Sequence, residues 1–279
     1  MRRTLCNLTL PFCALVTISG WVQAQEISPP ISFKQAVPPP ESGLTEEYAG
    51  RGVAHFQAGA FEEAISDLTH AIQLNPTNAT AIFYRACAYR AKGSLELSLK
   101  DWDRYIPLNP TNDFAYKSRA SVYNVRGQFD RAIKDWDEGL RLNSKDATAL
   151  AMRGFAYAGK GQYSRAIEDF TEALRLDPVN QSAKNSLGWL RATCPVAALR
   201  DGKEAVKEAT KACDLTGWTD WTRIDTLAAA FAEAGQFKKA VDSQKRAMGM
   251  RGPSSDDLQA MRERLSLYQQ RQPYHEGQP

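Results

Sequence analysis

The sequence predicts an all-α protein built as a solenoid of paired helices. The main observation is a repeat with a period of 34 residues, and its clearest copy spans residues 147–180. Arginine, glycine and aspartate each recur at this period in four consecutive copies. Such a period, kept by three residue types, is typical of stacked repeat architectures. The recurring residues are Arg51, Arg85, Arg119 and Arg153; Gly59, Gly93, Gly127 and Gly161; and Asp67, Asp101, Asp135 and Asp169.

Within one copy, small and aromatic residues lie where two antiparallel helices need them. Small side chains at positions 8, 20 and 27 let the helices approach closely, and aromatic side chains at positions 11 and 24 fill the space between these contacts. Glycine at position 15 permits a tight turn, and proline at position 32 ends the second helix. Counted from Ala147, these residues are Gly154, Tyr157, Gly161, Ala166, Phe170, Ala173 and Pro178.

This pattern resembles the tetratricopeptide (TPR) repeat. The resemblance implies a right-handed superhelical solenoid of about six helical hairpins. Four regular units are expected at residues 45–180. Residues 181–252 are expected to form a degenerate unit, with an insertion of about five residues, and one further regular unit. The phrase LGWLRATCP and the alanine-rich helix after it resemble the closing repeat pair of exported bacterial TPR proteins.

Residues 253–279 are predicted to form a capping helix and a disordered tail that begins at Gln272. Serine and aspartate start the helix, and apolar residues follow at helical spacing. A terminal repeat needs a polar outer face for solubility. The apolar residues are Leu258, Met261, Leu265 and Tyr268, and the expected polar face comprises Arg262, Glu263, Arg264 and Gln269.

The N-terminus reads as a signal peptide at residues 1–24. Two arginines precede an apolar run from Leu8 to Ile18, and Val22-Gln23-Ala24 fits a cleavage site. The run has about 11 residues, whereas a membrane-spanning helix needs about 20. We therefore expect an exported protein, periplasmic, envelope-associated or secreted, with no integral membrane span after cleavage.

Residues 25–44 are expected to form an extended, proline-rich linker. The composition is ordinary for a globular protein: over the whole chain, 43% of the residues are hydrophobic and 24% are charged. The net charge of +3 falls to +1 when Arg2 and Arg3 are removed with the signal peptide. Without basic clustering, the sequence does not indicate a nucleic-acid partner.

The mature chain retains three cysteines, an odd number that leaves at least one thiol unpaired. Cys194 and Cys213 lie in the same degenerate unit, and a bridge between them could add about 3 kcal/mol of stability. In paired helices they would lie roughly 15 Å apart at ~1.5 Å rise per residue. A disulfide tolerates a Cα separation of only about 4.4 to 6.8 Å. A bridge would therefore require the loop after Cys194 to fold back.

The recurring arginine and aspartate occupy positions 7 and 23, which lie at about the same height in a hairpin. We predict a structural ladder of ion pairs, within a hairpin or between neighbouring ones, because an arginine beside a helix interface needs a partner. An anion-binding row of arginines is the functional alternative. The ladder comprises Arg51, Arg85, Arg119 and Arg153 with Asp67, Asp101, Asp135 and Asp169.

The resemblance implies that first-helix positions 2, 5, 9 and 12 line a concave groove that binds a peptide or partner protein. The carried-over groove residues are Phe83, Arg90, Phe114, Lys117, Asn124, Phe155 and Trp189. Phe83 and Trp189 are equally well explained as core between repeats. The linker residues Ile27, Ile31 and Phe33 offer a third possibility, occupation of the groove by the chain itself. The carboxylate clamp of some TPR domains has no match here.

No nucleophilic, acid–base or phosphate-binding constellation indicates catalysis, and no cysteine or histidine spacing indicates a metal site or cofactor. The leading hypothesis is a non-enzymatic scaffold that binds protein in its groove. The alternatives are a self-associating structural component of the envelope and an accessory subunit of an enzyme. Asn78-Ala79-Thr80 and Asn180-Gln181-Ser182 are formal glycosylation sequons that we interpret as helix caps and turns.

Overall fold

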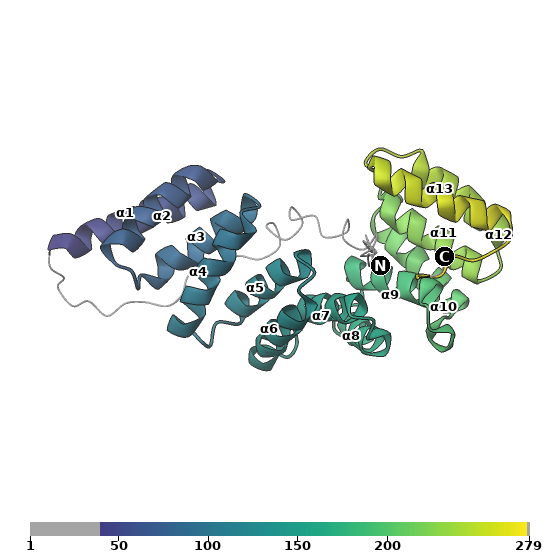
Figure 1. Cartoon of the computed structure of the whole chain (residues 1–279), viewed down its shortest axis with the longest axis horizontal. Helices are drawn as coiled ribbons and strands as arrows, with labels where there is room; N and C mark the ends of the chain where they lie inside the picture. Colours follow the sequence, from purple (N-terminus) through teal and green to yellow (C-terminus); the bar gives the residue numbers. More distant parts are fainter. Residues whose placement is uncertain (1–39, 278–279) are drawn as a thin grey trace, which may run out of the picture. The chain divides into compact units, whose positions relative to one another are not determined.

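The computed structural model describes residues 40–277, and this part of the chain contains helices and no strand (Figure 1). The expected all-α class is confirmed. The described residues form two compact units, one of residues 40–144 and one of residues 145–277. Each unit is a stack of helical hairpins.

The first unit contains three hairpins, whose two helices pack against each other across a short turn (Figure 1). Successive hairpins then pack through neighbouring helices. The helices are α1 (Pro40–Gln57) with α2 (Phe61–Leu74), α3 (Ala79–Ala91) with α4 (Leu95–Leu108), and α5 (Asp113–Val125) with α6 (Phe129–Leu142).

The second unit contains three more hairpins and a final helix that packs against the last of them. The loop of the middle hairpin is longer and includes a short 3₁₀ helix, η3 (Ala197–Leu199). The α-helices are α7 (Ala147–Gly159) with α8 (Tyr163–Leu176), α9 (Gln181–Thr193) with α10 (Gly202–Leu215), α11 (Trp221–Glu233) with α12 (Phe237–Met248), and α13 (Ser255–Gln269).

The last residue of each regular repeat caps the first helix of the next repeat. Its side chain accepts a hydrogen bond from the backbone N–H three residues later, at 2.9–3.4 Å. Such a cap satisfies an N–H that has no partner within the helix. Both formal sequons therefore contain a capping asparagine. The capping residues are Asn78, Asn112, Asp146 and Asn180.

The core follows the repeat positions predicted to be small or aromatic. Trp102, Trp136 and Phe170, all at position 24, are at most 1% exposed. Their neighbours at position 20, Ser98, Ala132 and Ala166, are fully buried, and so is Ala173 at position 27. Because the aromatic ring fills the space that small neighbours leave, the helices of a hairpin pack closely.

The N-terminal boundary of the first hairpin differs from the expectation. Helix α1 begins at Pro40, so residues 40–44, predicted as the end of the linker, are helical. Proline is favourable in the first turn of a helix, because its φ is already helical and its missing N–H would have no partner there. The predicted signal peptide and residues 25–39 of the linker lie outside the described residues. Within residues 40–277, no helix has the length and apolar character needed to cross a bilayer.

The insertion in the degenerate unit is held against α11. Arg191 and Arg200 donate to backbone carbonyls of the loop, and Arg200 Nε also lies 3.0 Å from Glu233 Oε1. Gly202 begins α10 directly against the end of α11. A Cβ at this position would lie 2.6 Å from the backbone nitrogen of Ala234. The loop therefore needs glycine here for a close approach of two backbones.

The cysteines of the described residues are all buried thiols, and Cys194 and Cys213 are not bridged. Burial raises the pKa of Cys87 and of Cys213 to about 12. These thiols therefore stay protonated and unreactive at neutral pH.

Two expectations for the C-terminus are wrong. Residues 272–277 are not a disordered tail: they lie against α9 and α11 through contacts with Trp189, Thr193 and Glu233. Arg264 does not belong to the polar outer face of the cap, since it is 3% exposed and bonds Asp225. Composition alone could not reveal these contacts, because their partners are 39 or more residues away in sequence.

We expect Gly202→Ala to lower the free energy of unfolding by about 1–3 kcal/mol, because the added Cβ collides with backbone that cannot move aside. Gly249→Ala is the control, since a Cβ there meets nothing closer than 3.5 Å. It should change stability by less than about 0.5 kcal/mol. Urea denaturation compares the two variants, and equal effects would contradict the close approach.

Candidate partner-binding surfaces

The residues predicted to line a groove are mostly buried. Phe83, Lys117, Asn124, Phe155 and Trp189 are only 3–8% exposed. Their side chains therefore act chiefly in contacts within the chain. Arg90 and Phe114 are half-buried and offer more surface.

Phe83 belongs to an aromatic cluster that joins the second and third hairpins. Its ring centroid lies 5.2–5.4 Å from those of Tyr84, Trp102, Tyr105 and Phe114. Aromatic pairs at this spacing add about 0.5–1.5 kcal/mol beyond the area that they bury. The interpretation of Phe83 as core between repeats is therefore favoured. Phe114 lies at the edge of the cluster, with part of its surface exposed.

Lys117 is held in place within its own helix. Its Nζ lies 2.7 Å from Asp113 Oδ2, one turn earlier, and its side chain is 4% exposed. The aliphatic part of the side chain covers Gly139 of α6, where an added Cβ would lie 2.7 Å from Lys117 Cγ. Because Lys117 is buried and already paired with a carboxylate, it offers little surface for direct contact with a partner.

The arginines at position 7 pair with the aspartates at position 23 of the same hairpin in all four regular repeats. In each pair Nε and Nη2 donate to the two carboxylate oxygens at 2.7–2.8 Å. This bidentate geometry is the strongest form of a charged hydrogen bond between side chains. The pairs are Arg51–Asp67, Arg85–Asp101, Arg119–Asp135 and Arg153–Asp169.

Two of these arginines also bond the preceding repeat. Arg85 Nη1 donates to Thr69 Oγ1 at 3.0 Å, and Arg119 Nη1 donates to Asp103 Oδ1 at 2.7 Å. The third guanidinium nitrogen thus links neighbouring hairpins. Since these donors already have partners within the chain, the arrangement favours the structural ladder over an anion-binding row.

The electrostatic environment changes along the ladder. The hydrogen bonds that Arg51 donates to Asp67 lower the pKa of Asp67, while the slight burial of Asp67 acts to raise it. Burial acts to lower the pKa of Arg119, but the hydrogen bonds and charge of Asp135, together with the bond to Asp103, outweigh burial and raise this pKa. The Arg51 side chain is 49% exposed and that of Arg119 only 18% exposed. Solvent therefore screens the first pair much more than the third.

In the two later hairpins, the buried carboxylates have partners other than an arginine at position 7. In the degenerate unit Glu208, at position 23, accepts from Lys184 Nζ at 3.2 Å and from Lys211 Nζ at 3.0 Å. In the last hairpin Gln244 donates to Asp225 at 2.7 Å. The sequence pattern showed that the arginine–aspartate pair ends after four repeats, but it did not reveal these replacements.

The C-terminal strap, defined as residues 272–277, contacts the first helices α9 and α11. Trp189 Nε1 donates to Glu276 Oε1 at 2.7 Å, and the Glu276 backbone N–H donates to the Thr193 carbonyl at 2.8 Å. The Tyr274 ring lies 6.2 Å from that of Trp189. Between these two contacts, His275 Nε2 lies 2.7 Å from Glu233 Oε2. Trp189 is therefore both a predicted groove residue and the main contact of a polypeptide segment.

Burial raises the pKa of Glu276, although the Trp189 hydrogen bond and the charge of Arg264 oppose this shift. Arg264 lies below both rings, with Cζ 5.5 Å from the centroid of Trp189 and 5.6 Å from that of Tyr274. A cation against two aromatic faces is attracted to their electron density. The strap site thus combines an N–H donor, a carbonyl acceptor, a carboxylate and a cationic aromatic wall.

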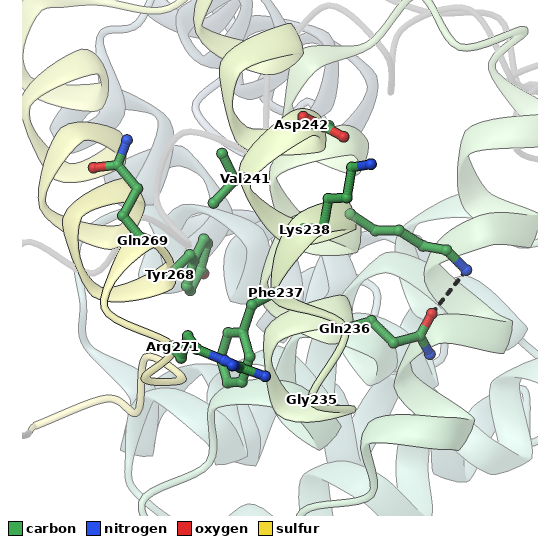
Figure 2. Close-up of a pocket in the computed structure, with 10 residues that line it drawn as sticks. Gly235, Gln236, Phe237, Lys238, Val241, Asp242, Tyr268, Gln269 and Arg271 are labelled. Atoms are coloured by element: carbon green, nitrogen blue, oxygen red, sulfur yellow. Dashed lines mark hydrogen bonds between the residues drawn. The ribbon is translucent and has the colours of Figure 1, made fainter.

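A separate hollow of about 690 Å³ lies between the start of α12 and the end of α13 (Figure 2). Phe237, Val241 and Tyr268 line it, together with the polar residues Lys238, Asp242, Gln269 and Arg271. Lys239, also in the lining, donates to Gln236 at 2.8 Å. The hollow lies beside α13, which has no second helix of its own within residues 40–277. Among these same residues, no group of three or more histidine, cysteine or acidic side chains could hold a metal ion.

We expect Asp135→Asn and Asp135→Ala to lower the free energy of unfolding by about 3 kcal/mol, because each leaves the Arg119 guanidinium partly buried without its carboxylate. Asp67→Asn is the matched control and should cost at most about 1 kcal/mol, because its arginine is exposed. Urea denaturation monitored by circular dichroism measures both. Stability unchanged in both Asp135 variants would rule out the structural role.

Comparison with protein families identifies the tetratricopeptide repeat at residues 45–78 and 147–178, the first and fourth predicted units. No curated protein matches the chain.

Solved structures of TPR proteins match both units' architecture. A TPR protein from Parabacteroides merdae ATCC 43184 has a TM-score of 0.67 and 20% identity, over 82% of this chain and 88% of that one. PilW, described as a type IV pilus biogenesis factor, has a TM-score of 0.64 and 14% identity, over 78% of this chain and 97% of that one. YrrB, described as a TPR protein with an unusual peptide-binding site, has a TM-score of 0.53 and 18% identity, over 70% of this chain and 97% of that one. Residues 45–78 and 147–178 are thus tetratricopeptide repeats, and the chain has the fold of tetratricopeptide repeat proteins.

Proposed function

We propose that this protein is a non-enzymatic scaffold that binds a segment of a partner protein on the first helices of its hairpins. One observation carries the proposal: a polypeptide segment, the C-terminal strap, already lies on α9 and α11 with Trp189 as its main contact. The same helices are the ones that TPR resemblance assigns to ligand binding. YrrB, which shares the fold, is described as having a peptide-binding site.

In the first unit, the corresponding surface centres on Arg90 and Phe114. Both are half-buried on first helices, α3 and α5, so they combine a fixed position with exposed area. Half-buried aromatic and arginine side chains are frequent anchors in protein interfaces. The buried ring of Phe83 supports Phe114 from within, with the two ring centroids 5.4 Å apart. A partner segment would therefore contact Phe114 directly and depend on Phe83 indirectly.

Two alternatives remain distinct from this proposal. A self-associating envelope component would show concentration-dependent light scattering by the purified protein. An accessory subunit of an enzyme would copurify with one enzymatic activity. Neither alternative has a specific contact in the described residues in its favour.

We also propose that the protein acts outside the cytoplasm, in the periplasm, the envelope or the medium. The charged start, the short apolar run and the cleavage pattern of residues 1–24 support this placement. The buried thiols Cys87, Cys194 and Cys213 are compatible with such a compartment, since protonated, inaccessible cysteines do not exchange readily with disulfides.

We expect a photo-crosslinking amino acid at Phe114 or Arg90 to form a discrete adduct with one partner in cells that contain the protein. Lys134, exposed on the second helix α6, is the matched control and should form none. Mass spectrometry of the adducts identifies the partner and the segment bound. Adducts confined to Lys134 would favour self-assembly through the opposite face.

We expect the mature protein purified from its native host to begin at Gln25, as intact-mass measurement and N-terminal sequencing can establish. Replacing Ala24 by a bulky residue such as Trp should block this cleavage, because the signal peptidase site requires small residues. Mature protein that still begins at Met1 and remains in the cytoplasm would contradict export.

A further inference from the structure

We propose that the surface around Trp189 is a recognition site for an extended partner segment that carries an aromatic residue and, two residues later, a carboxylate. The C-terminal strap is the ligand that the chain itself supplies to this site. The inference rests on the proposed protein-binding role and gives it a second surface and a partner chemistry.

Residues 272–275 of the strap lie outside helix and turn, and a turn begins at Glu276; up to that point the side-chain contacts alternate between two partners. Tyr274 and Glu276 both contact Trp189, whereas His275 between them contacts Glu233. In an extended segment alternate side chains point to opposite sides, so residues two apart reach the same partner. The Glu276 backbone N–H adds a bond to the Thr193 carbonyl. Because that bond involves backbone, any extended segment of this register could make it.

The site is held in place by residues other than the strap. Arg264 is fixed by Asp225, whose two oxygens lie 2.9 and 3.1 Å from Nη2, and Gln244 supports the same carboxylate. Glu233 is held by Arg200 of the insertion loop at 3.0 Å. These supports come from the cap, the last hairpin and the insertion. None of these supporting bonds involves the strap, which favours a wall that is preorganised for its ligand.

The chemistry of the wall selects its ligand. Trp189 presents an indole N–H, which donates only and therefore favours an oxygen acceptor such as a carboxylate. Arg264 adds positive charge beside that acceptor and a face against which an aromatic ring can lie. Glu233 favours a cationic or hydrogen-bond-donating residue between the two. Aromatic, donor, acid is the order found in Tyr274, His275 and Glu276.

The strap is tethered through a turn that carries backbone strain. Arg271 has φ +60°, in the left-handed region that favours glycine. A short tether holds the strap at an effective concentration on the order of millimolar. A partner segment binds only if its affinity and concentration are high enough to displace the strap. Occupation of the site by the strap therefore sets a threshold for partner binding.

The test uses the full-length chain and a fluorescent peptide with the sequence of residues 270–277. In the strap variant Tyr274→Ala with Glu276→Ala, the internal competitor is weakened while Trp189, Arg264 and Glu233 stay intact. Fluorescence anisotropy should show that this variant binds the peptide at least tenfold more tightly than the wild-type chain. Peptides with either Tyr274 or Glu276 replaced by alanine should bind at least tenfold more weakly.

Two controls locate the binding. Adding Trp189→Phe to the strap variant keeps a ring but removes the N–H donor, and should lower the affinity for the peptide. Equal affinity of the wild-type and strap variants, no binding to either, or indifference to the peptide substitutions would overturn the proposal. A dimer formed by exchange of straps, detected by sedimentation, would also overturn it, because the ligand would then be a second copy of this chain.

A second measurement applies if the strap variant does not fold by circular dichroism. Hydrogen exchange of the wild-type strap is measured with and without millimolar peptide, and displacement should speed exchange at residues 272–277. Unchanged exchange would overturn the proposal. Either failure leaves crosslinking from Phe114 unaffected, so it is distinguishable from failure of the proposed function.

Discussion

The close approach of the two helices within each hairpin is the constraint on which the rest of the structure depends. Small residues at positions 8 and 20 remove the side chains that would hold the helices apart, and in the second, third and fourth hairpins one large ring at position 24 fills the remaining space. Trp136 is fully buried in this way, although a neighbouring residue, Asp135, is charged. Burying that aspartate is possible only because the same close approach brings Arg119 within bonding distance. The ion pair is thus a consequence of the packing, and it also fixes the relative height of the two helices.

After the fourth repeat the buried ion pairs change, because the last hairpin packs against the capping helix rather than against another repeat. In two of the regular repeats, the arginine of one hairpin also reaches the preceding hairpin, as Arg119 reaches Asp103. In the last hairpin, Asp225 instead binds Arg264 of the cap. The buried charge therefore fastens the final helix rather than another repeat. Arg264 in turn supports Trp189, so the device that closes the stack also builds the surface on which the strap lies.

The insertion and the strap, two departures from a regular repeat, meet at Glu233. One carboxylate oxygen accepts from Arg200 of the insertion and the other lies against His275 of the strap. Gly202 lets the insertion reach this position by permitting contact between backbones. A loop that looks like degeneration of the repeat therefore has a structural partner. The unit that departs from the regular repeat, with its insertion at Arg200, therefore also helps to build the surface that the strap contacts.

The sequence by itself determined the hairpins, their register and the presence of an arginine–aspartate ladder, because each depends on a spacing of at most 34 residues that recurs; the structure decided that each arginine pairs within its own hairpin. The resemblance to the TPR repeat predicted Trp189 as a groove residue, with a place in the core between repeats as the alternative. Only the tertiary structure decided that Phe83 and Lys117 are buried, that Arg264 turns inward and that Tyr274 and Glu276 return to α9. Those outcomes depend on contacts between residues that are far apart in sequence. The positions of these residues do not recur from one repeat to the next. Periodicity carries no information about a contact that the chain makes once.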